Sequence, residues 1–326
     1  MGYDARGGGL IVKADMPGAA ASPRGKRKKR SAAKAAFVSV MLAYPVLHFA
    51  VTWGYVNFNA IWSSFTRYDI FADGNVFNGF LNYRMLWNRI TADESTRTML
   101  LNSFLYFPVT CFVSLPLSVV FSYFLFKKIP GGGAYRVIFY LPSILPIAVL
   151  TMSFRFAFGP DGFIDPILKA AGIQPPLWFG SSSLTPRMIF AYCVWAGLGF
   201  NIVLLSGAMS RVPKEIAEYG RLEGVGFARE LFQIMIPLVW PTVVTSFVLG
   251  MSSVLTVYLQ PYFLMGSSAT APFGTGTISL YIFNNYSSDI QGPYLAAFGL
   301  FCSVCYVPFI LLARWFMNRF FKDVDY

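Results

Sequence analysis

The sequence predicts an all-α membrane protein with six transmembrane helices, and three observations lead to this fold class. The 326 residues are 56% hydrophobic and only 13% charged, whereas soluble domains carry about 25% charged residues. Long stretches contain no Asp, Glu, Lys or Arg, and a helix of about 20 apolar residues crosses a bilayer. The Lys and Arg residues gather in alternate connections between these stretches, as they do in membrane proteins.

The uncharged stretches define the expected helices. They are residues 35–66, 100–126, 137–154, 188–210, 231–288 and 290–313. The fifth is too long for one helix, and its prolines divide it into a span and an uncharged loop. In the third, Ala157 and Phe158 continue the apolar run beyond Arg155. We therefore expect transmembrane helices over 35–61, 100–126, 137–158, 187–209, 241–265 and 293–316.

Most of these helices contain prolines, and none contains a carboxylate. The prolines are Pro45, Pro108, Pro116, Pro142, Pro146, Pro261 and Pro308. A proline frees a backbone carbonyl that lipid does not satisfy, so neighbouring helices or a water-filled cavity must cover it. Proton and sodium relays usually need an ionisable side chain inside the membrane. The pattern therefore predicts a packed bundle around a pathway and not an ion relay.

The placement of positive charge predicts the orientation. Residues 1–34, 127–136, 211–230 and 314–326 hold nine, three, four and three Lys and Arg, 19 in all, whereas the opposite connections hold six. The positive-inside rule then places both termini in the cytoplasm. This placement also accounts for the net charge of +11 without nucleic acid as a partner. We expect a disordered basic tail over 1–33, a transmembrane domain over 34–320 and a C-terminal tail over 321–326.

The sequence lacks the residue patterns of several catalytic and metal sites. His48 is the only histidine, so no His pair or His-based triad can form, and no GxxxxGK[ST] phosphate loop occurs. The four cysteines fall within predicted spans, where buried and inert thiols are expected. We therefore expect no catalytic residue, metal or cofactor of the chain's own. A secondary transporter and a six-helix membrane enzyme remain as alternatives, although neither internal repeats nor a polar catalytic cluster is found.

Residues 212–237, between the fourth and fifth expected helices, have the pattern of a helix, a bend and a further helix. Pro213 suits the first turn of a helix. An apolar edge recurs along this first helix and consists of Ile216, Tyr219 and Leu222. Gly224 and Gly226 permit a sharp bend before another short helix over 227–235. Such a segment, with a charged edge and a rigid elbow, is suited to a groove on another protein.

This segment resembles the EAA loop of permease subunits from binding-protein-dependent ABC importers. The residues that match are Glu218, Glu223, Gly224, Gly226, Ile234, Ile236 and Pro237. Residues 64–69 (SFTRYD) and 77–83 (FNGFLNY) are similar to the SFTxYD and FxGLxNY elements of carbohydrate permeases, and the FxGLxNY element resembles that of the maltose-type first permease. The family's Glu-Ala-Ala is Glu218-Tyr219-Gly220 here, and residues 266–272 stand where the family often has a run of glycines.

The resemblance implies a function and a set of partners. It implies a permease in a bacterial or archaeal cell (inner) membrane, paired as a heterodimer with another permease. Two partner ATPase subunits would bind ATP-Mg, and an extracytoplasmic binding protein would deliver a carbohydrate, which is an oligosaccharide, monosaccharide, polyol or glycerol-phosphate-type ligand. The residues expected to couple the permease to the ATPases are Glu215, Glu218, Arg221, Glu223, Gly224 and Gly226.

The substrate pathway is expected where the fourth and fifth helices face the partner permease. The family element W-x-G-x-x-(Y/F) aligns with Trp195, Gly197 and Phe200. The fifth helix offers Ser253, Thr256, Tyr258 and Gln260, and on one continuous helix Ser253, Thr256 and Gln260 would share a face. Carbohydrate needs neutral hydrogen-bonding groups beside aromatic faces, which these residues provide. The alternative is that they pack or hydrogen-bond locally between helices.

Overall fold

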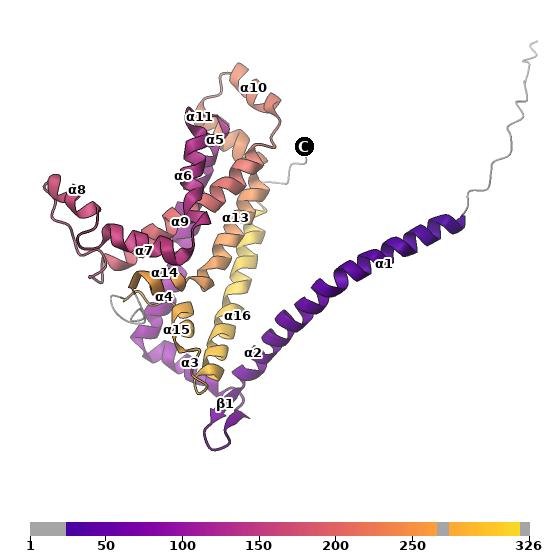
Figure 1. The fold of residues 1–326 in the computed structure, drawn as a ribbon, viewed down its shortest axis with the longest axis vertical. Coiled ribbons are helices and arrows are strands. Elements are labelled where there is room, and N and C mark those ends of the chain that lie inside the picture. The colour runs from indigo at the N-terminus through magenta and orange to yellow at the C-terminus, as the bar shows by residue number, and fades with distance from the viewer. Residues whose placement is uncertain (1–23, 266–273, 320–326) are drawn as a thin grey trace, which may run out of the picture. The chain divides into compact units, whose positions relative to one another are not determined.

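The structure is a computed structural model that describes residues 24–265 and 274–319, with only the backbone given for residues 24–33, Lys214, Ala217 and Arg221. The expected C-terminal tail 321–326 and residues 1–23 of the expected N-terminal tail lie outside the described residues. The chain forms two compact units, Met1–Asn59 and Ala60–Tyr326 (Figure 1).

The described residues of the first unit, 24–59, form a long helix that continues to Ser64 in the second unit. α1 (Arg24–Phe49) continues through a π-helical turn, η1 (Ala50–Tyr55), into α2 (Val56–Ser64). Residues 34–64 are long and apolar enough to cross a membrane, in agreement with the expected span 35–61. Residues 24–33, where a disordered tail is expected, are helical. The Arg, Lys and Ala residues there favour helix, and they extend the apolar helix at its N-terminal end.

In the second unit the end of α2 is followed by a β-hairpin that the all-α prediction does not contain. β1 (Thr66–Asp69) pairs with β2 (Gly74–Phe77) in antiparallel fashion, with Thr66 opposite Phe77. The prediction overlooked Asp73-Gly74, which indicates a hairpin, because Asp and Gly both tolerate the backbone conformations of a tight turn between two strands. Asp73 indeed has a φ of 43°.

The helices of the second unit follow in chain order. They are α3 (Leu81–Ala92), α4 (Glu94–Val109), the π-helical η2 (Thr110–Ser114), α5 (Leu115–Phe126), α6 (Gly132–Ile144), α7 (Ile147–Phe158), α8 (Ile164–Ala170), α9 (Thr185–Met209), α10 (Lys214–Leu222), α11 (Phe227–Glu230), the π-helical η3 (Leu231–Met235), α12 (Ile236–Leu238), α13 (Trp240–Ser253), the 3₁₀-helical η4 (Val254–Thr256), α14 (Leu259–Met265), α15 (Ile278–Asn285) and α16 (Gly292–Met317).

Six apolar spans are found in the described residues when each bent helix pair counts as one. Four are continuous, namely 34–64, 94–126, 185–209 and 292–317, and two are bent pairs. The second span begins at Glu94 rather than at residue 100, because Asp93 caps it. Its carboxylate accepts hydrogen bonds from the backbone N–H groups of Ser95 and Thr96 at 3.1 and 3.3 Å. The predicted number of spans is therefore confirmed.

The third span is bent where a continuous helix over 137–158 is expected. α6 and α7 meet at an angle of 109°. Pro146 disfavours a helical conformation at the residue before it, and Leu145 is extended, with φ −74° and ψ 143°. Pro142, one turn earlier, stays within α6. Pro146 therefore turns one expected helix into two short ones.

The fifth span agrees with the expected helix over 241–265 at its start and departs from it at its end. α13 begins at Trp240, after a bend of 78°, and the helix stops at Val257, whose backbone is extended. Pro261 has no N–H to donate to the Val257 carbonyl. That carbonyl instead accepts a hydrogen bond of 2.8 Å from Thr277 Oγ1, at the start of α15. The broken helix is thus joined to a segment that lies after the uncharged loop.

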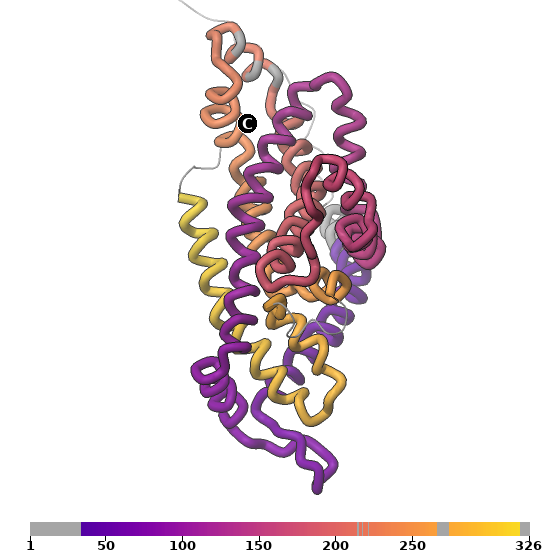
Figure 2. The backbone as a smooth tube through the Cα atoms, turned by 90° about the vertical axis from the view of Figure 1, so that its left-hand side faces the viewer, coloured from indigo at the N-terminus to yellow at the C-terminus, as the bar shows by residue number. Residues whose placement is uncertain are grey.

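The core of the second unit lies between α5, α9, α13 and η3. Its most deeply buried side chains are Tyr123, Leu205, Met209, Met235 and Met251, each with none of its surface exposed. α9 also packs closely on α6. A Cβ atom at Gly199 would lie 2.3 Å from the Phe139 carbonyl oxygen, so only glycine permits this approach. The two views show α9 running through the middle of the bundle (Figure 2).

Candidate functional site

A polar cavity of about 360 Å³ lies at the helix breaks of the second unit. Its walls come from η2, from the break between α6 and α7, from α9 and from the break after η4. Its polar side chains are Tyr106, Thr110, Ser114, Ser143, Tyr192, Asn201, Ser253, Thr256 and Gln260. The lining residues that the structure describes include no charged side chain.

Four of the seven predicted pathway residues line this cavity. They are Gly197, Ser253, Thr256 and Gln260. The expectation that the last three share one face of a continuous helix is wrong, because the helix ends at Val257. They come together because α14 folds back beside α7 and α9 after the break. Packing between helices therefore brings these three residues together, and not their spacing along one helix.

The other three predicted pathway residues lie elsewhere. Trp195 stacks on Phe154, with ring centroids 5.9 Å apart, and is 43% exposed. Phe200 lies on the outer surface of the unit and is 54% exposed. The ring of Tyr258 packs on that of Phe283, with ring centroids 4.9 Å apart, and lines a separate apolar hollow. These three rings do not line the cavity.

The cavity also contains polar residues that the sequence analysis missed. Thr110 and Ser114 are the first and last residues of the π-helical η2, and both line the cavity. π-Helical turns occur frequently at functional sites. A Cβ atom at Gly197 would lie 3.7 Å from Ser114 Oγ, so α9 and η2 are close together here. The available signal was a cluster of Ser and Thr residues next to Pro108 in an apolar span.

The hydrogen bonds of the cavity leave several groups available. Ser253 Oγ donates to the Gly250 carbonyl and Thr256 Oγ1 to the Ser253 carbonyl, both at 2.8 Å. These are the local bonds of the alternative interpretation, but each hydroxyl oxygen can still accept. Ser114 Oγ and Gln260 Oε1 are buried without a hydrogen-bond partner among the described residues. Such groups cost free energy unless a ligand or water satisfies them. The arrangement suits an uncharged solute rich in hydroxyl groups.

The predicted helix and bend of residues 212–237 are present at one end of the second unit. α10 exposes the side chains of Glu215 and Glu218, together with Tyr219 and Leu222, which are 68% and 83% exposed. Ile216 alone of the predicted apolar edge packs on the core. Glu223 is also exposed, whereas the side chain of Arg221 lies outside what the structure describes.

Gly224 forms the predicted elbow. Its φ of 69° is left-handed, a conformation that favours glycine. The N–H of Val225 donates to the Gly220 carbonyl at 2.9 Å, the hydrogen bond of a Schellman helix ending. Gly226 differs, because its φ of −69° and ψ of 163° are extended values open to any residue. The bend therefore depends on the first glycine.

A buried ion pair, which the sequence analysis missed, attaches this segment to the bundle. Lys127 Nζ, at the end of α5, lies 2.5 Å from Glu230 Oε2 of α11, and their side chains are 19% and 3% exposed. The ring of Phe227 contacts those of Tyr123 and Phe124, with centroids 4.9 and 5.1 Å apart. The ion pair and the aromatic group together fix α11 on α5.

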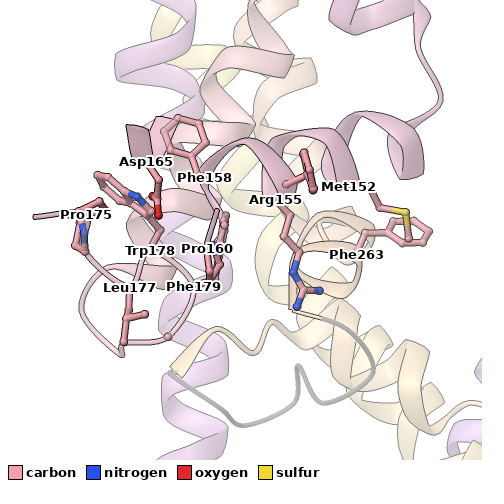
Figure 3. Close-up of a pocket in the computed structure, with 14 residues that line it drawn as sticks. Met152, Arg155, Phe158, Pro160, Asp165, Pro175, Leu177, Trp178, Phe179 and Phe263 are labelled. Carbon is pink, nitrogen blue, oxygen red and sulfur yellow. The ribbon is translucent and has the colours of Figure 1, made fainter. Parts of the chain in front are cut away.

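Another hollow, of about 560 Å³, lies between α7, the 159–180 connection and α14. Figure 3 shows Arg155 and Met152 on one side of it and Trp178, Phe158 and Asp165 on the other. None of the predicted pathway residues lines this hollow. Its opposite charges and apolar rings do not select one kind of solute.

Comparison with known families decides the identity of the fold. Residues 114–326, more than half of the chain, match the family described as binding-protein-dependent transport system inner membrane component. The chain belongs to this family. It is a multi-pass inner-membrane permease component of an ABC importer, in which ATP hydrolysis lies in partner subunits. The resemblance drawn from residues 212–237 is thus confirmed, and a membrane enzyme or secondary transporter is excluded.

Individual relatives are similar over most of the permease. The probable ABC transporter permease protein YurN of Bacillus subtilis is 24% identical over 243 residues, covering 72% of this permease and 80% of the relative. The lactose transport system permease protein LacF of Rhizobium radiobacter is 22% identical over 281 residues, covering 85% and 87%. The diacetylchitobiose uptake system permease protein NgcF of Streptomyces coelicolor is 25% identical over 295 residues, covering 87% and 81%.

Solved structures have the same fold. A chain in the crystal structure of a bacterial alginate ABC transporter, in complex with its alginate pentasaccharide-bound periplasmic protein, superposes with a TM-score of 0.76. It is 16% identical and covers 93% of this permease and 100% of its own length. At this identity the likeness shows the fold, which agrees with the predicted six-helix permease architecture.

Proposed function

We propose that the permease imports a sugar or oligosaccharide and that the cavity at the helix breaks is its half of the substrate pathway. The observation that carries the proposal is the uncharged, hydroxyl- and amide-lined wall, with Ser114 Oγ and Gln260 Oε1 buried and unpaired among the described residues. Sugar hydroxyls both donate and accept, so they can satisfy such groups. The names of several relatives, for lactose and diacetylchitobiose, support this substrate class.

The proposal includes partners. Another permease completes the pathway as a heterodimer, an ATPase dimer binds ATP-Mg, and an extracytoplasmic binding protein delivers the sugar. The permease itself uses no cofactor. The similar alginate transporter was crystallised with a periplasmic protein that carries an oligosaccharide, which supports the assignment of a binding protein.

The exposed face of α10 is the proposed contact with the ATPase. Glu215 and Glu218 are its acidic groups, Glu223 follows directly after the helix, and Tyr219 and Leu222 offer apolar contacts. Arg221, Gly224 and Gly226 complete the coupling segment. In this proposal Glu218 meets a basic group of the ATPase. Glu218→Lys should leave insertion and expression unchanged and weaken binding of the ATPase, because two like charges would then face each other across the interface. Full transport by this variant would remove Glu218 from the contact.

The proposed orientation places both termini and α10 in the cytoplasm. Single cysteines at Ser182 and Ser210, both exposed, lie in connections expected on opposite sides of the membrane. A membrane-impermeant thiol reagent added to intact cells should label the cysteine at 182 and not that at 210. Labelling of both from outside would contradict the six-span orientation.

The pathway is tested by filling the cavity. Gly197→Leu and Ser253→Leu place bulk in its wall and should abolish sugar uptake while ATP hydrolysis stimulated by the binding protein continues. Gly207→Leu and Ser252→Leu are matched controls on the same helices. A Cβ atom at Gly207 meets nothing within 4 Å, and Ser252 is exposed outside the cavity. Normal uptake by both cavity variants would place the site in the partner permease.

A further inference from the structure

The turn of the β-hairpin presents two apolar side chains to solvent. Ile70 and Phe71 lie between β1 and β2 and are 71% and 103% exposed. No other described residue buries the phenyl ring of Phe71. Within the second unit, the hairpin lies at the end opposite α10, as both views show (Figures 1 and 2). The fold gains no burial from Phe71 and little from Ile70.

The turn that carries them is held in one conformation. Asp69 Oδ1 accepts hydrogen bonds from the backbone N–H groups of Phe71 and Ala72 at 2.9 and 3.4 Å. The Tyr68 hydroxyl donates to Asp73 Oδ1 at 2.6 Å, which closes the turn from its other side. Side-chain to backbone bonds of this kind specify a turn. The apolar pair is therefore ordered before any partner arrives.

The base of the hairpin is fixed as well. Asn82, on α3 and only 2% exposed, donates from Nδ2 to the carbonyls of Ser64 and Thr66 at 2.8 and 2.7 Å. The Tyr83 hydroxyl donates to Ser64 Oγ at 2.8 Å. These bonds hold β1 against α3, so the turn is a rigid projection. A preorganised surface loses little conformational entropy on binding, which increases affinity.

The charges beside the turn favour a protein over a lipid surface. Arg67 lies 3.8 Å from Asp69 and offsets its charge, which leaves Asp73 as a net negative group next to Phe71. Helices that lie in the membrane interface are rich in Lys and Arg on their polar face, and anionic lipids attract these residues. An acidic flank around an exposed aromatic ring instead matches an apolar pocket with a basic rim, as found at the centre of protein interfaces.

We propose that Ile70 and Phe71 dock the permease onto its solute-binding protein. This inference rests on the proposed function, because the hairpin faces the binding protein only if α10 faces the cytoplasm. The binding protein presents an apolar pocket to Phe71 and a basic group to Asp73. The rigid hairpin sets the position at which the loaded protein releases its sugar above the pathway.

The test measures ATP hydrolysis by the complete transporter in lipid nanodiscs against the concentration of its sugar-loaded solute-binding protein. Phe71→Ser should raise the half-stimulating concentration about tenfold, the effect of losing an interface anchor, with the maximal rate unchanged. Tyr68→Phe keeps Phe71 but loosens the turn, and should raise it by about twofold to threefold. Phe163→Ser, at an exposed ring beside α8, is the matched control and should change it less than twofold.

Two outcomes would overturn the proposal. An unchanged half-stimulating concentration for Phe71→Ser would show that the turn makes no contact with the binding protein. A rise that appears in nanodiscs with anionic lipid and disappears with neutral lipid would assign the turn to the membrane surface. A wild-type transporter that the binding protein does not stimulate at all would instead contradict the proposed function itself, so the two failures are distinguishable.

Discussion

The two ends of the second unit are held in different ways. At one end, α11 and the elbow before it attach to α5 through Lys127 and Glu230, which are 103 residues apart, and through the ring of Phe227. At the other end, the β-hairpin is fixed by Asn82, which bonds to carbonyls 16 and 18 residues away. The contacts of the first end join segments that are far apart in the sequence, whereas the hydrogen bonds at the base of the hairpin join neighbouring segments, although β1 also contacts α16. Substitutions at the two ends should therefore differ in how far their effects spread through the structure and in how much stability they cost.

The largest effect is expected from the ion pair. Glu230→Leu leaves the ammonium group of Lys127 buried without its partner, and breaking a buried pair in this way destabilises by about 3–5 kcal/mol. We expect a lower midpoint of thermal unfolding for the purified permease complex and loss of the bound ATPase during size-exclusion chromatography.

The exchange of the two charges sharpens this prediction. Lys127→Glu combined with Glu230→Lys keeps an ion pair in the same place and should recover part of the stability and ATPase retention that Glu230→Leu loses. If the double variant is no better than the single one, the pair does not attach α11 to α5 through charge.

The next effect should remain at the hairpin. Asn82→Ala removes two hydrogen bonds and leaves the carbonyls of Ser64 and Thr66 without them, at a cost of about 1–3 kcal/mol. Hydrogen–deuterium exchange should become faster over residues 66–77 and stay unchanged over α10. Asn88→Ala, at an exposed position of α3, is the control. Faster exchange over α10 would mean that the hairpin is coupled to the whole bundle.

A substitution at the elbow, Gly224, should act only by straining the backbone. Gly224→Val places a β-branched residue in the left-handed region, where an L-residue costs about 1–2 kcal/mol, and a Cβ atom there meets nothing within 4 Å. Gly226→Val, at the other glycine of the coupling segment, adds the same side chain without backbone strain, since the backbone of Gly226 is extended and its Cβ atom is equally free. We expect stimulated ATP hydrolysis to fall further in Gly224→Val than in Gly226→Val. Equal rates of stimulated ATP hydrolysis in the two variants would show that the bend at Gly224 is not needed for coupling.

The smallest effect is expected at Asp93, between α3 and α4. The hydrogen bond from Thr96, together with those from backbone N–H groups, holds the pKa of Asp93 below its usual range. A lowered pKa in the folded state adds stability above the unfolded pKa, and this is lost as pH falls through the folded value. The unfolding midpoint of the wild type should therefore approach that of Asp93→Ala as the pH is lowered below about 4. A pH-independent difference would show that the charge of the cap is unimportant.

Local chemistry made several features predictable. The uncharged stretches predict six spans, because the requirement for about 20 apolar residues acts on each segment separately. The elbow at Gly224 is likewise local, since glycine reaches φ 69° without steric cost. The Asp69 and Asp73 side chains that shape the hairpin turn are local too, although the sequence analysis did not use that signal.

The sequence by itself determined the number of spans, the helix and elbow of residues 212–237, and the family. Only the tertiary structure decided which polar residues share the cavity, because the break at Val257 and the bend of 109° after Ile144 replace helical periodicity. It also decided the pairing of Lys127 with Glu230, because nothing in either segment specifies a partner 103 residues away. Apolar length and backbone conformation are properties of a segment, whereas a cavity and an ion pair are properties of the packing between segments.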